Sequence, residues 1–252
     1  MSEIGDIFLR KKEQGQRLAA LTAYDYVFGR LLDDMGLDFL LVGDSVGMVQ
    51  MGLPDTTGVT IEHMEHHLRC VVRAARKTPV FADLPAICGR GVEGLMEGAK
   101  RLMGAGAVAV KLEGGVEREL EVRRLVGEGI PFVGHLGMLP QRVREEGGYR
   151  VKGRTREEAR KLFEDAEFLE RAGAVAVVLE LVEPEVAAEI CSRHRIPFIG
   201  IGSGLGCDGQ ILVSYDLLGL MPWFRPSFVV PEAELGVEVR RAVGAFIERT
   251  RG

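Results

Sequence analysis

GAGAVAVKLEGG at 104–115 and RAGAVAVVLEL at 171–181 are near copies of one pattern. Each copy runs from the end of a predicted helix through a short apolar stretch to a glutamate, Glu113 in the first and Glu180 in the second. Uninterrupted runs of Val, Ala and Leu are typical of parallel strands that are buried on both faces. The repetition therefore predicts a parallel sheet assembled from equivalent strand-and-helix units.

The same alternation of apolar runs and helical segments extends over most of the chain. Segments with helical spacing, roughly 11 to 18 residues long, separate the runs and indicate right-handed βαβ units. The length of 252 residues matches the roughly 250 residues of a typical (β/α)8 barrel. We therefore predict an α/β fold, a (β/α)8 TIM barrel, with an open doubly wound sheet as the alternative. The eight predicted strands are 17–24, 37–42, 78–84, 107–114, 130–137, 174–181, 196–204 and 209–216.

A barrel of this kind uses the whole chain and leaves nothing for a second domain. We predict one domain over 1–252, with a short helix at 3–13 before the first strand. The last thirty or so residues carry aromatic side chains and then an amphipathic helical pattern. They are predicted to form a helical tail, part of which could pack on a neighbouring subunit.

Composition narrows the class of protein. A formal net charge of -5 opposes a nucleic-acid partner, because phosphate binding needs clustered positive charge and the Arg residues here lie among Glu. No apolar window approaches roughly 18 residues and the polar start lacks a signal-peptide pattern, so we expect a cytoplasmic protein with no membrane contact. The cysteines are too far apart in the sequence to form a zinc-binding CxxC pair, and we expect them to be free thiols. They are Cys70, Cys88, Cys191 and Cys207.

Ionisable residues close five of the apolar runs. They are Asp44, Asp83, Glu113 with Lys111 two residues before it, His135 and Glu180. Because active sites of barrels lie at the carboxyl ends of the strands, these side chains are predicted to share one site. Carboxylate oxygens suit a hard divalent cation such as Mg²⁺, which keeps several waters. The pattern indicates an enzyme that binds a metal and an anionic oxygen substrate.

The carboxylates are predicted to hold the metal. We expect Asp44 and Asp83 to be direct Mg²⁺ ligands and Glu113 to act through water; an Asx-turn or N-cap role is the alternative for Asp44. Strand alternation puts Lys111 and Glu113 on one inward face. A buried ammonium keeps its charge only beside carboxylates, so Lys111 is predicted to bind substrate oxygens. The alternative is a simple structural Lys–Glu pair.

The remaining rim residues are predicted to handle the substrate. Ser45 offers a hydroxyl and a backbone amide to a carboxylate, although it could be only a capping residue. His135, between glycines, could hydrogen-bond a substrate oxygen as a neutral imidazole. Glu180 lies across the barrel, free of the metal, and is predicted to be the general base that removes a proton beside a carbonyl. This set is suited to forming the enolate of a 2-oxo acid. The histidines of EHMEHH, at 62–67, are assigned to packing or the surface.

Several runs together resemble the ketopantoate hydroxymethyltransferase family from about residue 2 to 250. They are VGDSVGMVQMG, VTIEHMEHH, ADLP, VKLEGG, GHLGMLPQ, GGYRVKGR, IPFIGIGSGLGCDGQILVSYDLLGL and PSFV. The resemblance implies a barrel of the phosphoenolpyruvate/pyruvate superfamily and a homo-oligomer, commonly a decamer. It implies hydroxymethyl transfer from 5,10-methylenetetrahydrofolate to 3-methyl-2-oxobutanoate through a Mg²⁺-stabilised enolate. The product would be 2-dehydropantoate, in the first committed step of pantothenate and coenzyme A synthesis.

The resemblance also assigns roles residue by residue. The metal carboxylates of the family fall on Asp44, Asp83 and Glu113, and its substrate contacts on Ser45, Asp83 and Lys111. Its general base falls on Glu180, and His135 matches the histidine of GHLG. Two runs depart from the common pattern: AICGR at 86–90, which puts the pocket wall near Asp83 in doubt, and GIGSG at 200–204 in place of GIGAG.

Two other functions stay open at this stage. A carbon–carbon lyase or mutase of the same superfamily would use the same enolate, but such relatives carry a catalytic cysteine on a lid loop. Cys88 is the one candidate, and its neighbours do not match. A non-catalytic barrel would be expected to lack at least one rim residue, and none is missing.

Overall fold

The computed structural model of the protein describes residues 2–89 and 91–252. These residues fall into two compact units, of which the first ends at Ile211 and the second comprises Leu212–Gly252. The predicted single domain over 1–252, with its helical tail, stays a prediction.

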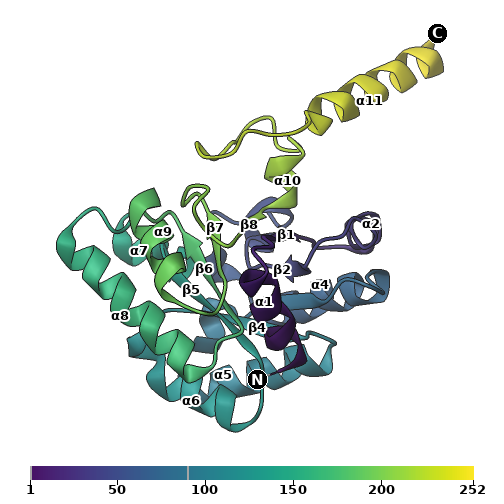
Figure 1. The fold of residues 1–252 in the computed structure, drawn as a ribbon. Helices are drawn as coiled ribbons and strands as arrows, with labels where there is room; N and C mark the ends of the chain where they lie inside the picture. The colour runs from purple at the N-terminus through teal and green to yellow at the C-terminus, as the bar shows by residue number, and fades with distance from the viewer. Residues whose placement is uncertain (1, 90) are drawn as a thin grey trace. The chain divides into compact units, whose positions relative to one another are not determined.

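A closed barrel of parallel strands forms the centre of the first unit (Figure 1). Neighbouring strands from β1 to β8 follow one another in chain order and pair in parallel. This confirms the predicted (β/α)8 barrel, and the open doubly wound alternative is wrong because the sheet closes. Among the described residues the strands are β1 (Leu18–Thr22), β2 (Phe39–Val42), β3 (Val80–Asp83), β4 (Ala109–Glu113), β5 (Phe132–Gly137), β6 (Ala176–Glu180), β7 (Phe198–Ile201) and β8 (Gly209–Leu212).

Helices connect the strands of the barrel and cover its outside. They are α1 (Glu3–Glu13), α2 (Tyr26–Leu32), α4 (Ile61–Ala74), α5 (Val92–Gly104), α6 (Glu119–Gly127), α8 (Arg156–Ala172) and α9 (Pro184–Arg193). Capping boxes start α4 at Thr60 and α8 at Thr155, and Gly173 ends α8 in the left-handed conformation. The histidine of the first box, His63, serves this cap, in agreement with its assignment to packing.

Short helical turns interrupt the long loops, and the sequence pattern did not predict them. They are α3 (Val46–Val49), η1 (Thr56–Gly58), η2 (Ala86–Gly89), η3 (Val116–Arg118), η4 (Pro140–Arg142) and α7 (Val143–Glu146). All of them lie in the connections that follow the carboxyl ends of β2, β3, β4 and β5. The loops beside the predicted site are therefore ordered segments.

The strand register places the ionisable residues at one level. Asp83 pairs with Lys111, and Glu113 pairs with His135 on the next strand. Gly137 of β5 in turn pairs with Glu180 of β6. Because the strands are parallel and adjacent, their carboxyl-terminal residues meet at the same end of the barrel.

Helix α1 packs against the amino-terminal side of the strands. Phe8 lies with its ring centroid 5.9 Å from that of Phe39, the first residue of β2, and 6.0 Å from that of Phe81. Phe39 and Phe81 are stacked, and all three rings are at most 1% exposed. This aromatic cluster fills the end of the barrel opposite the ionisable residues.

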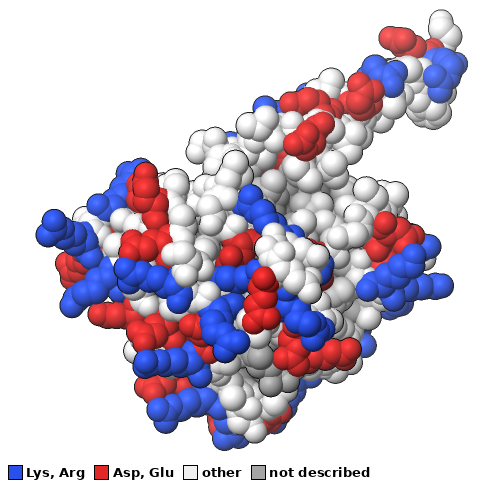
Figure 2. Space-filling view, in the orientation of Figure 1, with Lys and Arg blue, Asp and Glu red and all other residues white. Residues whose placement is uncertain are grey.

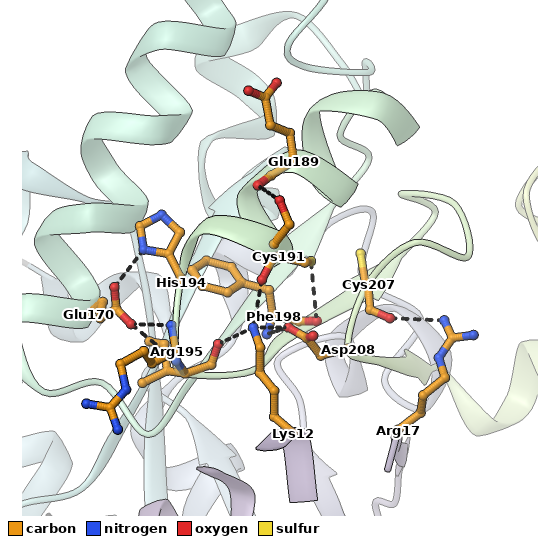
Figure 3. A network of polar contacts seen from close by, with 12 residues as sticks. Lys12, Arg17, Glu170, Glu189, Cys191, His194, Arg195, Phe198, Cys207 and Asp208 are labelled. Atoms are coloured by element: carbon orange, nitrogen blue, oxygen red, sulfur yellow. Dashed lines mark hydrogen bonds and ion pairs between the residues drawn. The ribbon is translucent and has the colours of Figure 1, made fainter. Parts of the chain in front are cut away.

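A polar network ties α1 to the strands beside it (Figure 3). Lys12 Nζ donates to Cys191 O at 2.8 Å and to Asp208 Oδ2 at 2.8 Å. Asp208 also accepts from Phe198 N at 2.9 Å, which joins the α9–β7 turn to the loop before β8. Cys191 and Cys207 are buried free thiols in this region, as predicted.

Surface charges alternate in sign. On the face that Figure 2 shows, Lys and Arg lie among Asp and Glu. Many belong to pairs four residues apart on one helix, such as Arg69–Glu65 on α4 and Arg123–Glu119 on α6. Pairs of this kind contribute a few tenths of a kcal/mol to a helix, on the order of 0.3–0.5.

The second unit contains α10 (Ser214–Leu217) and α11 (Leu235–Arg251). The predicted last strand, 209–216, is therefore too long, because Ser214 already begins a helix. Along α11, Val239, Val243 and Phe246 are exposed, which makes the predicted tail helix amphipathic without a buried apolar face. No helix among residues 2–89 and 91–252 has the length and apolar character that crossing a membrane would require.

Helix α2 is shorter than its sequence pattern predicts. The spacing of Val27, Leu31 and Met35 is typical of one apolar side of a helix, yet α2 ends at Leu32 and these three side chains are more than half exposed. The side of α2 that is buried carries Gly29, where an added Cβ would lie 3.0 Å from Ala74 Cβ. Helix α2 is therefore held against the protein by its close approach to α4 and not by a row of buried apolar side chains.

Asp33 fixes the end of α2 to the segment that leads into β3. Its Oδ1 accepts from Lys77 N and Thr78 N, both at 2.9 Å, and the residue is 2% exposed. Burial alone would raise the pKa of this carboxyl, but the backbone hydrogen bonds outweigh it and lower the pKa from 3.8 to about 2. The carboxylate form is therefore the stabilising one.

Asp33→Ala should lower the free energy of unfolding by about 2 kcal/mol, because the buried N–H of Thr78 and the partly buried N–H of Lys77 lose their acceptor. Since the folded pKa is depressed, the contribution is complete above the ordinary pKa of 3.8 and disappears as pH falls toward about 2. Urea titrations at pH 7 and at decreasing pH measure both effects. Asp34→Ala is the control, since Asp34 is exposed and pairs only with Lys77 at the surface. Equal losses in the two variants would contradict the assignment.

Candidate active site

A continuous set of charged side chains lines the carboxyl end of the barrel. Lys111 Nζ lies 2.9 Å from Asp83 Oδ1 and 3.2 Å from His135 Nδ1. His135 Nδ1 is 3.5 Å from Glu113 Oε1, and its Nε2 is 3.2 Å from Glu180 Oε2. The structure thus brings the predicted strand-end residues of β3, β4, β5 and β6 into contact.

Lys111 is the central cation of this set. Its side chain is 6% exposed. Burial would lower the pKa of Lys111, but the carboxylates of Asp83, Asp44 and Glu113 outweigh burial and raise the pKa above its usual value. The ammonium therefore stays charged inside the barrel. This agrees with the expectation that a buried lysine needs carboxylate neighbours.

His135 lies between two carboxylates. Burial and the Lys111 charge lower its pKa, whereas the neighbouring Glu113 and Glu180 carboxylates raise it, and the balance is a pKa of about 9. The expected neutral imidazole is therefore not the favoured form in this structure. The sequence argument placed His135 on the rim but did not foresee acids on both sides of the ring.

Asp44 follows β2 and faces the other acids. Its backbone N–H donates to Asp83 Oδ2 at 3.0 Å, and the N-cap position of α3 belongs to Ser45 and not to Asp44. Burial raises the pKa of Asp44 well above its ordinary value, and the nearby Asp83 charge raises it further. The carboxylates in this part of the site thus carry more negative charge than Lys111 balances.

Gln141 joins two of the acids, and the sequence analysis did not single it out. Its side-chain Nε2 donates to Asp44 Oδ2 at 2.8 Å and to Leu84 O at 2.9 Å. Its backbone N–H donates to Glu113 Oε2 at 3.1 Å. The signal that could have found it is the run GHLGMLPQ, whose last residue is Gln141.

Ser45 is held by a residue that the sequence analysis also missed. Its Oγ is 2.8 Å from the hydroxyl of Tyr24, which is fully buried beyond the end of β1. Ser45 occupies the N-cap position of α3 but makes no side-chain cap bond. Its hydroxyl is therefore oriented by Tyr24 and not by the helix.

Glu180 stands at the open side of the set. Its side chain is 15% exposed, against 2% for His135. Met138 N donates to Glu180 O at 2.8 Å, and an added Cβ on Gly137 would lie 2.2 Å from the same oxygen. Gly137 has φ +95°, so only glycine lets β5 approach β6 this closely.

The donor set suits a hard cation in its chemistry. Asp83 Oδ1 and Glu113 Oε1 are buried and accept no hydrogen bond, although Lys111 and His135 lie near them. In the described part of the chain, no group of three or more His, Cys, Asp or Glu side chains is already arranged to hold a metal ion. Mg²⁺ ligation by Asp44, Asp83 and Glu113 stays a prediction, favoured by surplus carboxylate charge.

The unusual segment AICGR is described only in part. Ala86–Gly89 forms η2, while Arg90 lies outside the described residues. Cys88 is 7% exposed, and its Sγ would be 2.8 Å from a Cβ added to Gly98 of α5. Burial raises the pKa of the Cys88 thiol. A protonated thiol packed against a helix does not suit the catalytic lid cysteine of a lyase.

Solved structures of low sequence identity share this fold. A phosphonopyruvate hydrolase in complex with oxalate and Mg²⁺ superposes with a TM-score of 0.67 at 11% identity, over 100% of this chain and 89% of that one. 2,3-Dimethylmalate lyase, a member of the PEP mutase/isocitrate lyase superfamily, gives 0.61 at 18% identity, over 100% and 88%. These likenesses agree with the predicted barrel fold.

Sequence relatives are much closer. A 3-methyl-2-oxobutanoate hydroxymethyltransferase of Nitratidesulfovibrio vulgaris is 47% identical over 245 residues, which cover 96% of this chain and 80% of that protein. The profile of the family described as ketopantoate hydroxymethyltransferase matches residues 5–252. The family resemblance inferred from the motifs is confirmed, and the chain belongs to the ketopantoate hydroxymethyltransferase family.

Proposed function

We propose that this chain is an enzyme that transfers a hydroxymethyl group from 5,10-methylenetetrahydrofolate to 3-methyl-2-oxobutanoate and forms 2-dehydropantoate, a step of pantothenate synthesis. Family membership over residues 5–252 supports the reaction. The observation that carries it in the structure is the contact chain from Asp83 through Lys111 and His135 to Glu180. It puts a fixed cation and an accessible carboxylate on two sides of one site.

Glu180 is the proposed general base. It is the most exposed acid of the set, so a substrate that enters from the open end of the barrel reaches its carboxylate first. The proton would move from C3 of the 2-oxo acid to a Glu180 carboxylate oxygen. A positioned base contributes roughly 10²–10⁴ in rate. His135, 3.2 Å away through Nε2, orients that carboxylate.

Lys111 and Ser45 are the proposed substrate-binding groups, together with Asp83 and His135. Removing the C3 proton leaves negative charge on the keto oxygen, and the Lys111 ammonium is a fixed positive charge in a water-poor setting. Ser45 offers its hydroxyl, held by Tyr24, to the substrate carboxylate. Lys111 is held by Asp83 and Ser45 by Tyr24, and such fixed donors are the condition for electrostatic stabilisation of a transition state.

Mg²⁺ is the proposed cofactor. Asp44 and Asp83 would hold it directly and Glu113 through water, and the bound ion would supply Lewis-acid polarisation of the substrate oxygens. The raised pKa of Asp44 supports this, because adjacent buried carboxylates favour a cation between them. 5,10-Methylenetetrahydrofolate is the proposed co-substrate, and a homo-oligomer, as large as a decamer, and a cytoplasmic location stay predictions.

Loss of the cation should stop the reaction. We expect EDTA to abolish product formation and Mg²⁺ to restore it, and Asp44→Ala to weaken Mg²⁺ binding more than about 100-fold, beyond the effect of a residue that only supports a ligand. Titration calorimetry with MgCl2 measures binding without any turnover. Undiminished activity in EDTA would exclude the metal.

Gln141→Ala should weaken Mg²⁺ binding by about 10–100-fold, because the amide orients Asp44 and is not a ligand itself. The barrel should stay folded, since the backbone bond from Gln141 N to Glu113 remains. Calorimetry compares it with Gln16→Ala, a change at an exposed glutamine. An affinity equal to that of the parent would show that Gln141 does not position the metal ligand.

Proton removal should be separable from transfer. Without folate, the protein should exchange the C3 proton of 3-methyl-2-oxobutanoate for deuterium in D2O, as followed by NMR. Glu180→Gln should lower both the exchange rate and turnover by about 10²–10⁴, or about 3–5 kcal/mol of barrier, and leave Mg²⁺ affinity unchanged. Glu183→Gln is the matched control. Glu183 lies in the connection that follows β6 and pairs with Arg154. Rescue of Glu180→Gln by excess Mg²⁺ would make Glu180 a metal ligand.

A further inference from the structure

The backbone directly after Glu180 is strained. Leu181 has φ 49°, and within residues 2–89 and 91–252 no other residue except glycine has a positive φ. Such a conformation costs on the order of 1–3 kcal/mol for a residue with a Cβ, so the surroundings must hold it. Contacts around Leu181, next to the proposed base, must therefore compensate for this strain.

Ser203 follows the end of the neighbouring strand β7, and its side chain bridges residues 179–182, the segment around Leu181 that we call the corner. Its Oγ donates to Leu179 O at 2.8 Å and accepts from Val182 N at 2.9 Å, with Ile201 O farther away at 3.4 Å. Ser203 is fully buried. One hydroxyl therefore bonds the residue before Glu180 and the second residue after it.

Backbone hydrogen bonds complete the corner. Leu181 N donates to Ile201 O at 2.9 Å, and Lys152 N donates to Leu181 O at 2.7 Å. These bonds do not depend on side-chain identity, whereas the Ser203 bonds do. The serine hydroxyl is thus the part of the corner that a substitution can remove while the backbone hydrogen bonds of Leu181 stay in place.

Ser203 is the serine of the run GIGSG at 200–204, which stands where the resembled family commonly has GIGAG. Ser203 points its hydroxyl back at β6, and the flanking Gly202 and Gly204 have φ +64° and +78°, which let the chain turn around that side chain.

We propose that Ser203 is a positioning residue for Glu180. Its hydroxyl closes the Leu179–Val182 corner, and the corner sets the direction in which the Glu180 carboxylate leaves β6, 3.2 Å from His135 Nε2. Ser203 touches neither substrate nor cation; it acts through Glu180. The proposal rests on the proposed function, in which Glu180 accepts the C3 proton.

Loss of the hydroxyl would loosen the corner without breaking its backbone hydrogen bonds. Ser203→Ala removes one oxygen atom and leaves Val182 N without its acceptor, so the strained segment can relax. A displacement on the order of 1 Å at a reacting group lowers rates by up to about 100-fold. With the backbone bonds intact, we expect a loss of about tenfold in kcat, with KM for 3-methyl-2-oxobutanoate changed less than about twofold.

Turnover of four proteins tests the proposal: the parent, Ser203→Ala, Glu180→Gln and the double variant. If Ser203 acts through Glu180, its substitution costs about tenfold in the parent and nothing further once Glu180 is Gln. Ser192→Ala is the control, because Ser192 on α9 is exposed and bonds only Glu189 O. The same loss in both backgrounds, an unchanged kcat in Ser203→Ala, or a loss confined to KM would overturn the proposal.

Amide hydrogen exchange provides a readout that does not need activity. Val182 N–H should exchange at least about tenfold faster in Ser203→Ala than in the parent, while amides of β4 stay protected. Unchanged Val182 protection would overturn the proposal whatever the kinetics show. A parent protein that gives no product and no C3 exchange, but in which Val182 loses protection in Ser203→Ala, would refute the proposed function and confine Ser203 to holding the corner.

Discussion

The buried contact between Lys111 and Asp83 is the interaction on which the carboxyl end of the barrel depends. Both side chains are at most 6% exposed, so each charge has lost its water and needs the other. One ammonium does not balance Asp44, Asp83 and Glu113, and burial together with the neighbouring Asp83 charge raises the pKa of Asp44. Three of the carboxylate oxygens take neutral donors: the Asp44 amide bonds Asp83, and Gln141 bonds Asp44 and Glu113. The carboxyl end of the barrel therefore holds more negative charge than its own ammonium group balances, and a bound cation would balance the rest.

Stability and chemistry are divided between the two ends of the same strands. At the amino-terminal end Phe8 of α1 closes the barrel on Phe39 and Phe81, and Lys12 satisfies two backbone carbonyls and Asp208. Because this end carries the packing, the other end can hold like charges close together at a cost in stability.

Local signals explain how much could be predicted from the sequence. The strands are short apolar runs, and their last residues point to one end in any parallel barrel, so Asp83, Glu113 and Glu180 could be placed together without coordinates. Gln141 and Tyr24 could not, because a neutral side chain outside the strands has no pattern that names its partner; only the fold brings Gln141 to Asp44. The prediction for α2 was wrong for the opposite reason: apolar spacing predicts burial, whereas close contact at Gly29 decides which side of the helix faces α4.

The groups that orient the charged residues are themselves uncharged, and electrostatics gives the reason. A second ammonium beside Asp44, or a guanidinium beside Glu180, would hold the carboxylate firmly but would also lower its pKa and weaken it as a ligand or a base. An amide or a hydroxyl fixes direction through hydrogen bonds of about 2.8–2.9 Å and adds no charge. Gln141 and Ser203 are of this kind, and both lie in connections beyond the strand ends. In this barrel the strands therefore supply the charges, and the loops aim them without changing the balance that the proposed chemistry requires.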